Sequence, residues 1–168
     1  MKVQAKQTGF TIVELLIVIV VIGILAAITI VAYNGVQNRA YDTAVQNDLN
    51  SFANRLELTK VDSISGSYPV SFTTQTGFKM SKDAYDTSAN NVFYCLNTVT
   101  DQYALGFTSK SGNSFSYTIS NGLQSSATRL RGVETCNLVG ISTWRGAGSV
   151  GIYGYDQLGG TGWSNWVN

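Results

Sequence analysis

An apolar run from Phe10 to about Ala32 constrains this 168-residue chain more than any other feature. The run is interrupted only by Thr11, Glu14, Gly23 and Thr29. The hydrocarbon core of a bilayer is about 30 Å thick and needs about 20 helical residues, so the run is long enough to cross it. In lipid, a lone segment satisfies its backbone groups only as a helix, which outweighs the weak helix propensity of Ile and Val. The sequence therefore predicts a membrane-spanning helix.

Glu14 is the acidic side chain within this run. A carboxylate inside a membrane span costs roughly 2 to 3.5 kcal/mol at the centre and less toward an end. No Lys, Arg or His lies between Phe10 and Val31, so a charged partner has to come from outside the segment. Position alone leaves two interpretations open: Glu14 has such a partner, or it lies in interfacial water.

Residues 1–9 form a short polar leader that carries Lys2 and Lys6 and no acidic residue. Positively charged flanks tend to stay in the cytoplasm, so we expect the C-terminal part of the chain to be exported. The apolar run is longer than the roughly 7 to 15 residues of a secretory signal peptide, and no A-x-A triplet follows it. An ordinary secretory signal peptide therefore does not fit.

The junction between leader and apolar run has a distinctive sequence: Gly9, Phe10, Thr11, Glu14 and Leu15, then GILAAI at positions 23–28 and Tyr33. This sequence resembles the N-terminal signature of type IV prepilins and type II secretion pseudopilins, which have a class III leader. The resemblance implies that a prepilin peptidase cuts between Gly9 and Phe10 and that the new amino group of Phe10 is methylated. It also implies that Glu14 pairs with the Phe10 amine of a neighbouring subunit, which would supply the missing partner.

One position departs from the pattern of many pilins, which have a proline just before the equivalent of Ala32. This chain has Val31 there. A proline would bend the helix and remove a backbone hydrogen bond. We therefore expect a straighter helix, with Gly23 as its weak point.

The helical pattern continues beyond the span. Apolar residues recur at steps of three and four, at Ala32, Val36, Ala40, Ala44, Val45, Leu49, Phe52, Ala53 and Leu56. We expect one helix from Phe10 to about Lys60. Residues 10–32 would be its membrane and assembly half, and residues 33–60 an amphipathic half packed on a globular domain.

The remaining chain predicts a connecting loop over residues 61–91 and a small sheet with a glycine-rich and aromatic end over residues 92–168. The runs NVFYCLNT, YALGFTS and SFSYTIS predict three antiparallel strands, and Phe115, Tyr117 and Ile119 alternate with Ser and Thr in the third. The segment ATRLRGVETCNLVGI would add a strand or cover the sheet edge. The patterns therefore predict an α+β fold with a long helix packed on an antiparallel meander, and the resemblance implies that this fold is type IV pilin-like.

The two cysteines are Cys95 and Cys136. Because this part of the chain is expected to be exported, a disulfide is the expected state. It would close a loop of about 42 residues, worth roughly 4 kcal/mol in the loop-entropy model. Two buried free thiols are the alternative.

All three tryptophans, Trp144, Trp163 and Trp166, lie in the glycine-rich end, residues 140–168, which we expect to be mostly loop. Its aromatic side chains would either pack on the sheet or form a recognition surface. Trp163 and Trp166, near the end of the sequence, are the candidates for exposed recognition residues.

The sequence argues against an enzyme. The chain has no histidine, and two distant cysteines do not make a zinc site, so we expect no cofactor and no metal. Two carboxylate pairs, Asp83 with Asp86 and Asp101 with Glu134, are interpreted as ordinary surface charge.

Nucleic acid is a minor alternative as a partner. The chain has 11 Lys and Arg against 10 Asp and Glu, and two of its lysines belong to the leader, so it has no overall basic field. A local patch could form from Arg129, Arg131 and Arg145, and DNA-capturing pilins exist in the family that the chain resembles.

We therefore interpret the sequence as a prepilin, major or minor, whose mature form polymerises through its N-terminal helix into a type IV pilus for adhesion or twitching motility. The alternative is a pseudopilin of a type II secretion system, or a DNA-uptake minor pilin that binds a ligand through its C-terminal region. The resemblance implies other copies of the chain, a prepilin peptidase, an assembly platform and an extension ATPase as partners. It places the precursor in the inner membrane as a single-pass protein with a cytoplasmic leader, and the mature subunit in an extracellular filament.

Overall fold

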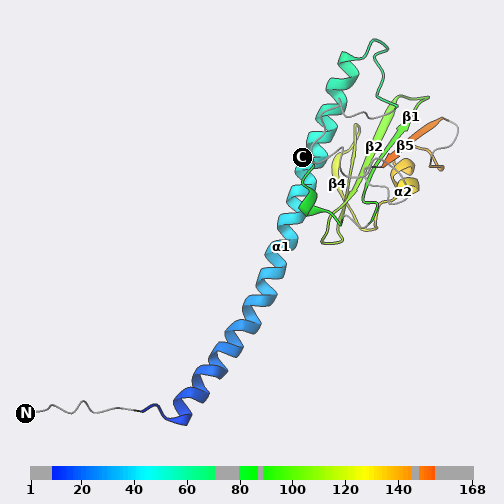
Figure 1. Cartoon of the computed structure of the whole chain (residues 1–168). Helices are drawn as coiled ribbons and strands as arrows, with labels where there is room; N and C mark the ends of the chain where they lie inside the picture. Colours follow the sequence, from blue (N-terminus) through cyan, green and yellow to red (C-terminus); the bar gives the residue numbers. More distant parts are fainter. Residues whose placement is uncertain (1–8, 71–79, 87–88, 145–147, 154–168) are drawn as a thin grey trace, which may run out of the picture. The chain divides into compact units, whose positions relative to one another are not determined.

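The computed structural model describes residues 9–70, 80–86, 89–144 and 148–153 (Figure 1). The predictions that concern leader residues 1–8, Arg145, Trp163 and Trp166 lie outside these residues. The chain forms two compact units, residues 1–37 and residues 38–168, and each is described by itself.

The first unit contains the N-terminal part of helix α1, which spans Ile12–Asp62. The helix is continuous through Gly23 and Val31, as expected for a chain without proline in this region. Every side chain from Ile12 to Val36 is exposed. The prediction of one long helix is confirmed, and within the first unit its apolar side chains have no protein core to enter.

The second unit packs the C-terminal part of α1 against a sheet. The helix buries Val45, Leu49, Phe52, Ala53 and Leu56, which fall on one face because they are spaced three or four residues apart. The predicted apolar stripe began too early, because Ala32, Val36 and Ala40 are exposed. Strand length explains the difference: a strand of seven residues is about 23 Å long and covers only about 15 residues of a helix.

The sheet is antiparallel and has five strands in the order β4-β3-β2-β1-β5. Their bounds are Val92–Asn97 for β1, Gln102–Thr108 for β2, Ser114–Thr118 for β3, Gly122–Ser126 for β4 and Ser149–Tyr153 for β5. The three predicted strands are confirmed as β1 to β3. Ile119 does not belong to β3, which ends at Thr118, and its side chain is exposed.

Two strands and one short helix correct the prediction for the rest of the chain. β4 is mostly polar and only partly buried, so it shows no alternating apolar pattern. β5 lies in the glycine-rich end that was expected to be mostly loop, and it pairs with β1. The segment at residues 127–141 contains helix α2, Gly132–Asn137, rather than a strand.

The two faces of the sheet carry different cores. Val92, Tyr94 and Leu96 of β1 belong to the large core that includes α1. Cys95 points to the other face and joins a small core with Ala104, Cys136 and Val139. Figure 1 shows α2 beside β1 and β2 and away from α1, so the second unit is layered as helix, sheet and short helix.

The region predicted as a connecting loop contributes to the larger core. A 3₁₀ helix, η2, spans Lys82–Ala84, and the core includes Tyr68, Met80, Ala84 and Tyr85. The hydroxyl of Tyr85 donates to Asp48 Oδ2 of α1 at 3.0 Å. This contact fixes the loop to the helix.

Candidate assembly site

Thr11 and Glu14 form a hydrogen-bonded box at the start of α1. The backbone N–H and the hydroxyl of Thr11 donate to Glu14 Oε2 at 2.9 Å and 2.8 Å. The backbone N–H of Glu14 donates in return to Thr11 Oγ1 at 3.2 Å. This reciprocal pattern is a capping box, in which each side chain satisfies a backbone donor that the first helical turn leaves unpaired.

The capping box differs from both sequence-based interpretations of Glu14, a partner outside the segment or interfacial water. Its signal is the spacing Thr-x-x-Glu immediately before an apolar run, at Thr11 and Glu14. We considered only a partner outside the segment or interfacial water for Glu14, and the structure adds a partner within the same turn. Among the described residues, Glu14 Oε1 accepts no hydrogen bond, so the carboxylate retains capacity for a second donor.

The cleavage junction predicted at Gly9 and Phe10 precedes the helix and is exposed, with Phe10 91% accessible. A Cβ atom added at Gly9 would meet no atom within 4 Å. The fold therefore does not require glycine at this position. A requirement for glycine at this position would come from the peptidase site that the resemblance implies, and it stays a prediction.

The surface of α1 from Leu15 to Ile28 is apolar on all sides of the helix. The helix contains an 18-residue window of mean hydropathy 3.3 that is not buried at all, so by length and composition it can cross a membrane. The largest side chains of this surface are exposed by about half or more, among them Ile17, Ile22, Leu25 and Ile28. A surface of this size and composition requires lipid or other protein to cover it.

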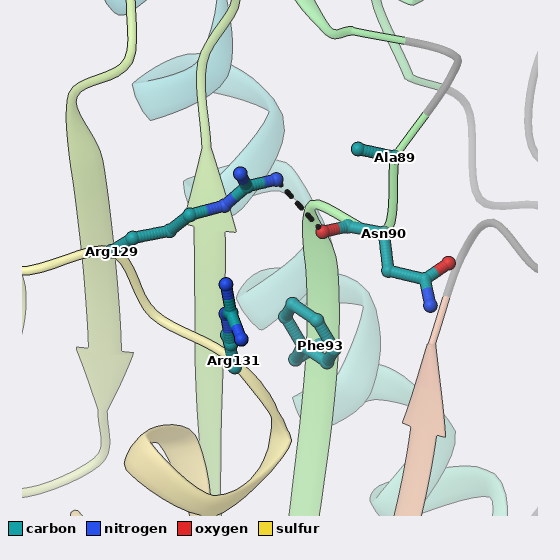
Figure 2. Close-up of a pocket in the computed structure, with 5 residues that line it drawn as sticks. All are labelled: Ala89, Asn90, Phe93, Arg129 and Arg131. Atoms are coloured by element: carbon teal, nitrogen blue, oxygen red, sulfur yellow. Dashed lines mark hydrogen bonds between the residues drawn. The ribbon is translucent and has the colours of Figure 1, made fainter.

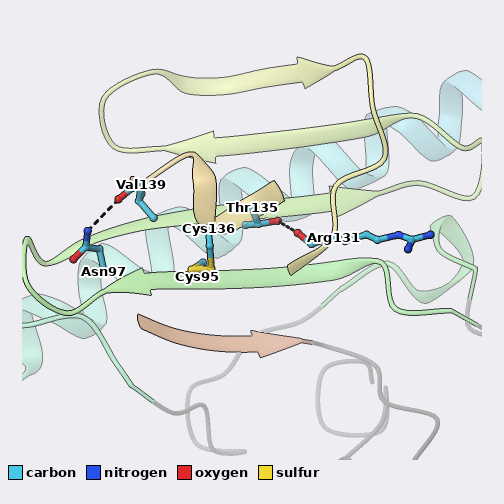
Figure 3. The surroundings of a disulfide bond; sticks show 6 residues. All are labelled: Cys95, Asn97, Arg131, Thr135, Cys136 and Val139. Carbon is cyan, nitrogen blue, oxygen red and sulfur yellow. Dashed lines mark hydrogen bonds between the residues drawn. A yellow bond between two sulfur atoms is a disulfide. The ribbon is translucent and has the colours of Figure 1, made fainter. Parts of the chain in front are cut away.

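The disulfide between Cys95 and Cys136 is present, with Cα atoms 5.2 Å apart (Figure 3). It joins β1 to α2. Nearby, Asn97 Nδ2 donates to the carbonyl oxygen of Val139 at 3.0 Å, which ties the chain after α2 to the same strand. These bonds hold α2 on the face of the sheet opposite α1.

Trp144 packs on the sheet and is not a free recognition residue. Its ring meets that of Phe93 edge to face, with centroids 5.7 Å apart. A Cβ at Gly132 or Gly151 would come within 2.4 Å or 2.7 Å of the Trp144 ring, so both glycines are needed to admit it. Trp144 thus follows the packing interpretation of the C-terminal aromatics.

Two carboxylates in the second unit, Asp101 and Glu57, hold parts of the fold together. Asp101 forms an ion pair with Lys60 at 2.7 Å and accepts a bond from the backbone N–H of Tyr68 at 3.1 Å. Glu57 accepts from the hydroxyls of Tyr68 and Tyr103. Burial and the charge of Glu57 raise the pKa of Tyr103, so this hydroxyl remains a donor. In the part of the chain that the structure describes, no group of three or more His, Cys, Asp or Glu residues is placed to hold a metal.

Comparison with known proteins finds a family match that includes the Gly9–Phe10 junction and Glu14. Residues 4–30 match the family described as the prokaryotic N-terminal methylation motif. The chain is 32% identical over 76 residues to type II secretion system core protein G of Pseudomonas aeruginosa. These aligned residues cover 45% of this chain and 50% of the relative. Proteins of the same name from Vibrio cholerae and Escherichia coli are 36% and 34% identical over 62 residues, which is 37% of this chain and 42% and 43% of each relative.

The chain thus spans half or less of the length of these curated relatives. No solved structure matches it. The matches confirm the resemblance of the chain to prepilins and type II secretion pseudopilins.

Proposed function

From this prepilin-type N-terminus, we propose that the chain is the precursor of a pseudopilin, a filament subunit of a type II secretion system. One observation carries the proposal: the N-terminal part of α1 has an exposed apolar surface, and its first turn holds the Thr11–Glu14 capping box next to an exposed Gly9–Phe10 junction. The curated relatives are named for secretion, which favours this role over a pilus for adhesion or motility.

The proposed mechanism follows from where the apolar surface can go. In the precursor, lipid covers the helix and the leader with Lys2 and Lys6 stays on the cytoplasmic side. Cleavage after Gly9 creates an amino group on Phe10, which is then methylated. In the filament, the helices of neighbouring copies replace the lipid, and Glu14 meets the amine of a neighbour. Because each copy uses one surface to bind a different surface of the next, the contact does not close and a helical fibre grows.

The proposed partners follow from these steps. A prepilin peptidase removes the leader, and other copies of the chain form the filament. An assembly platform in the inner membrane and an extension ATPase would drive addition of subunits. Nucleic acid is not part of this proposal.

Processing can be tested by producing the full chain together with a prepilin peptidase in bacterial membranes. We expect mass spectrometry to find a mature chain that begins with methylated Phe10. Gly9→Val should remain uncut. Gly23→Val is the matched control, because a Cβ at either glycine meets no atom within 4 Å and position 23 lies away from the junction. Cleavage of Gly9→Val, or an uncut wild-type chain, would contradict the proposal.

Secretion and motility can be separated in the organism that carries the gene. We expect deletion to reduce the proteins found in the culture supernatant and to leave twitching unchanged. The wild-type gene should restore secretion, and the Gly9→Val gene should not. Loss of twitching with normal secretion would instead identify a type IV pilus subunit.

A further inference from the structure

A pocket with two arginines lies on the face of the sheet that carries α2. It has a volume of ≈ 390 Å³ and is lined by Ala89, Asn90, Phe93, Arg129 and Arg131 (Figure 2). Phe93 comes from β1, the two arginines from the segment between β4 and α2, and the other two residues from the turn before β1. Figure 2 shows the side chain of Arg131 beside the ring of Phe93 and below the guanidinium group of Arg129.

The local backbone explains why both arginines reach the same space. Between them lies Leu130, which is only 4% exposed and whose backbone N–H donates to Ser114 Oγ at 3.4 Å. In an extended segment, alternate side chains point the same way, so burial of Leu130 turns its two neighbours outward together. The carbonyl oxygen of Arg131 accepts from Thr135 Oγ1 at 2.7 Å, which ties its backbone to the first turn of α2.

The charge of this pocket is not balanced within the described chain. Arg129 Nη2 donates only to the carbonyl oxygen of Asn90, at 3.4 Å. The ion pair of Lys60 with Asp101 involves neither arginine, and no carboxylate is among the described residues that line the pocket. A guanidinium group has five N–H donors, so most donors of both side chains are available to a ligand.

We propose that this pocket binds an oxyanion, a carboxylate or phosphate group, of a small ligand. The planar donor fork of arginine matches both groups with paired hydrogen bonds, and one anion would relieve the repulsion between two neighbouring cations. The volume exceeds that of a single ion and falls within the range of small-molecule sites, and Phe93 offers an apolar wall for the ligand's carbon atoms.

This site goes beyond the proposed filament function and does not depend on it. It lies on the side of the sheet that α1 does not cover, and none of its residues belongs to the first unit. Blocking assembly by Gly9→Val should therefore leave the pocket intact.

The test uses the full chain with Gly9→Val, so that it stays a precursor, in a non-ionic detergent and with ¹⁵N-labelled arginine. The Nε–Hε signals of Arg39, Arg55, Arg129, Arg131 and Arg145 are assigned by single Arg→Gln substitutions. Succinate and inorganic phosphate are titrated separately at constant ionic strength, with chloride as the control anion. We expect the Arg129 and Arg131 signals to shift and saturate with one or both oxyanions, while Arg39 and Arg55 stay unchanged.

Variants then establish the site. Arg131→Gln should weaken binding at least about tenfold, and Arg39→Gln, an exposed arginine on α1, should leave it unchanged. Both should keep the Cys95–Cys136 disulfide, which reports that the fold is intact. Saturation by succinate alone identifies a carboxylate ligand, and saturation by phosphate alone identifies a phosphate ligand. Equal shifts with chloride, shifts of all arginines without saturation, or unchanged binding by an Arg129→Gln and Arg131→Gln double variant would overturn the proposal.

Discussion

Glu14 belongs to the capping box and has a proposed second role in the subunit contact. A single substitution can separate the two, because the capping box needs its hydrogen bonds and the proposed contact needs its charge. Glu14→Gln retains an amide oxygen that can accept from the Thr11 N–H, and glutamine serves in capping boxes as glutamate does. It carries no charge. Thr11→Ala does the reverse: it removes the hydroxyl that bonds Glu14 at 2.8 Å and 3.2 Å and leaves the carboxylate.

The expected magnitudes differ enough to be distinguished. Loss of an N-cap hydroxyl costs about 1 kcal/mol and would fray only the first turn of α1. Removal of one partner from a buried charge pair costs roughly 3 to 5 kcal/mol, because the other charge is left unpaired in a low dielectric. At about 1.4 kcal/mol for each factor of ten, that lowers the equilibrium for adding a subunit by roughly two to four orders of magnitude.

The assay combines an immunoblot for leader cleavage with filament counts by electron microscopy, in cells where the variant is the only copy. We expect normal cleavage in Thr11→Ala, Glu14→Gln and Glu14→Ala, since none alters Gly9 or Phe10. Filaments should form from wild type and Thr11→Ala and be rare or absent from both Glu14 variants. Abundant filaments from Glu14→Gln would show that Glu14 acts only as a cap and that the charge pair is wrong.

Three further predictions concern the second unit. Cys95→Ser with Cys136→Ser should lower the free energy of unfolding by about 4 kcal/mol, measured by denaturant titration, and an unchanged value would show that the loop-entropy argument fails here. Gly132→Ala should lower the free energy of unfolding by about 1 to 3 kcal/mol, because its Cβ would overlap the Trp144 ring. Gly35→Ala is the control: nothing lies within 4 Å of a Cβ there, so this variant should not lower the melting temperature of the second unit. Burial alone would raise the pKa of Asp42, but hydrogen bonds from Ser109, Ser111 and Asn113 more than offset it, so the folded pKa lies below 3.8. The resulting stabilisation is present above pH 3.8 and is lost as pH falls through the lowered pKa. The difference in unfolding free energy between wild type and Asp42→Asn should therefore shrink over that pH range. A difference that grew as pH fell would contradict this assignment.

The helix and the three central strands were predictable because each follows a local period. The five buried residues of α1 from Val45 to Leu56 repeat at helical spacing, and Val92, Tyr94 and Leu96 alternate with residues on the other face. The start of burial at Val45 was not predictable, because it depends on how far the sheet extends along the helix. β5 was missed because its pairing with β1 joins segments that are distant in sequence.

The candidate sites also divide into residues that a local sequence motif predicts and residues that only the tertiary structure brings together. Gly9, Phe10 and Glu14 are predicted from a linear motif, and the Thr11–Glu14 box has a local signature in the spacing Thr-x-x-Glu. The arginine pocket needs the tertiary structure, because Phe93 and Arg131 meet only once the sheet has formed (Figure 2). Sequence proximity grouped Arg129 and Arg131 with Arg145, which lies outside the described residues, and gave no indication of an aromatic wall.

The capping box also explains how the proposed precursor can keep an acidic residue in its membrane helix before a partner exists. An unpaired carboxylate near the end of a span is costly, yet the Thr11 N–H and hydroxyl both donate to Glu14 Oε2 in the isolated chain. Hydrogen bonds to a charged acceptor are about twice as strong as neutral ones, so they offset part of the desolvation cost. Neither donor is removed when the leader is cut after Gly9, and Oε1 still accepts no bond from the described residues. Glu14 is therefore stabilised within its own subunit while it keeps an acceptor oxygen for the proposed contact with the amine of the next subunit.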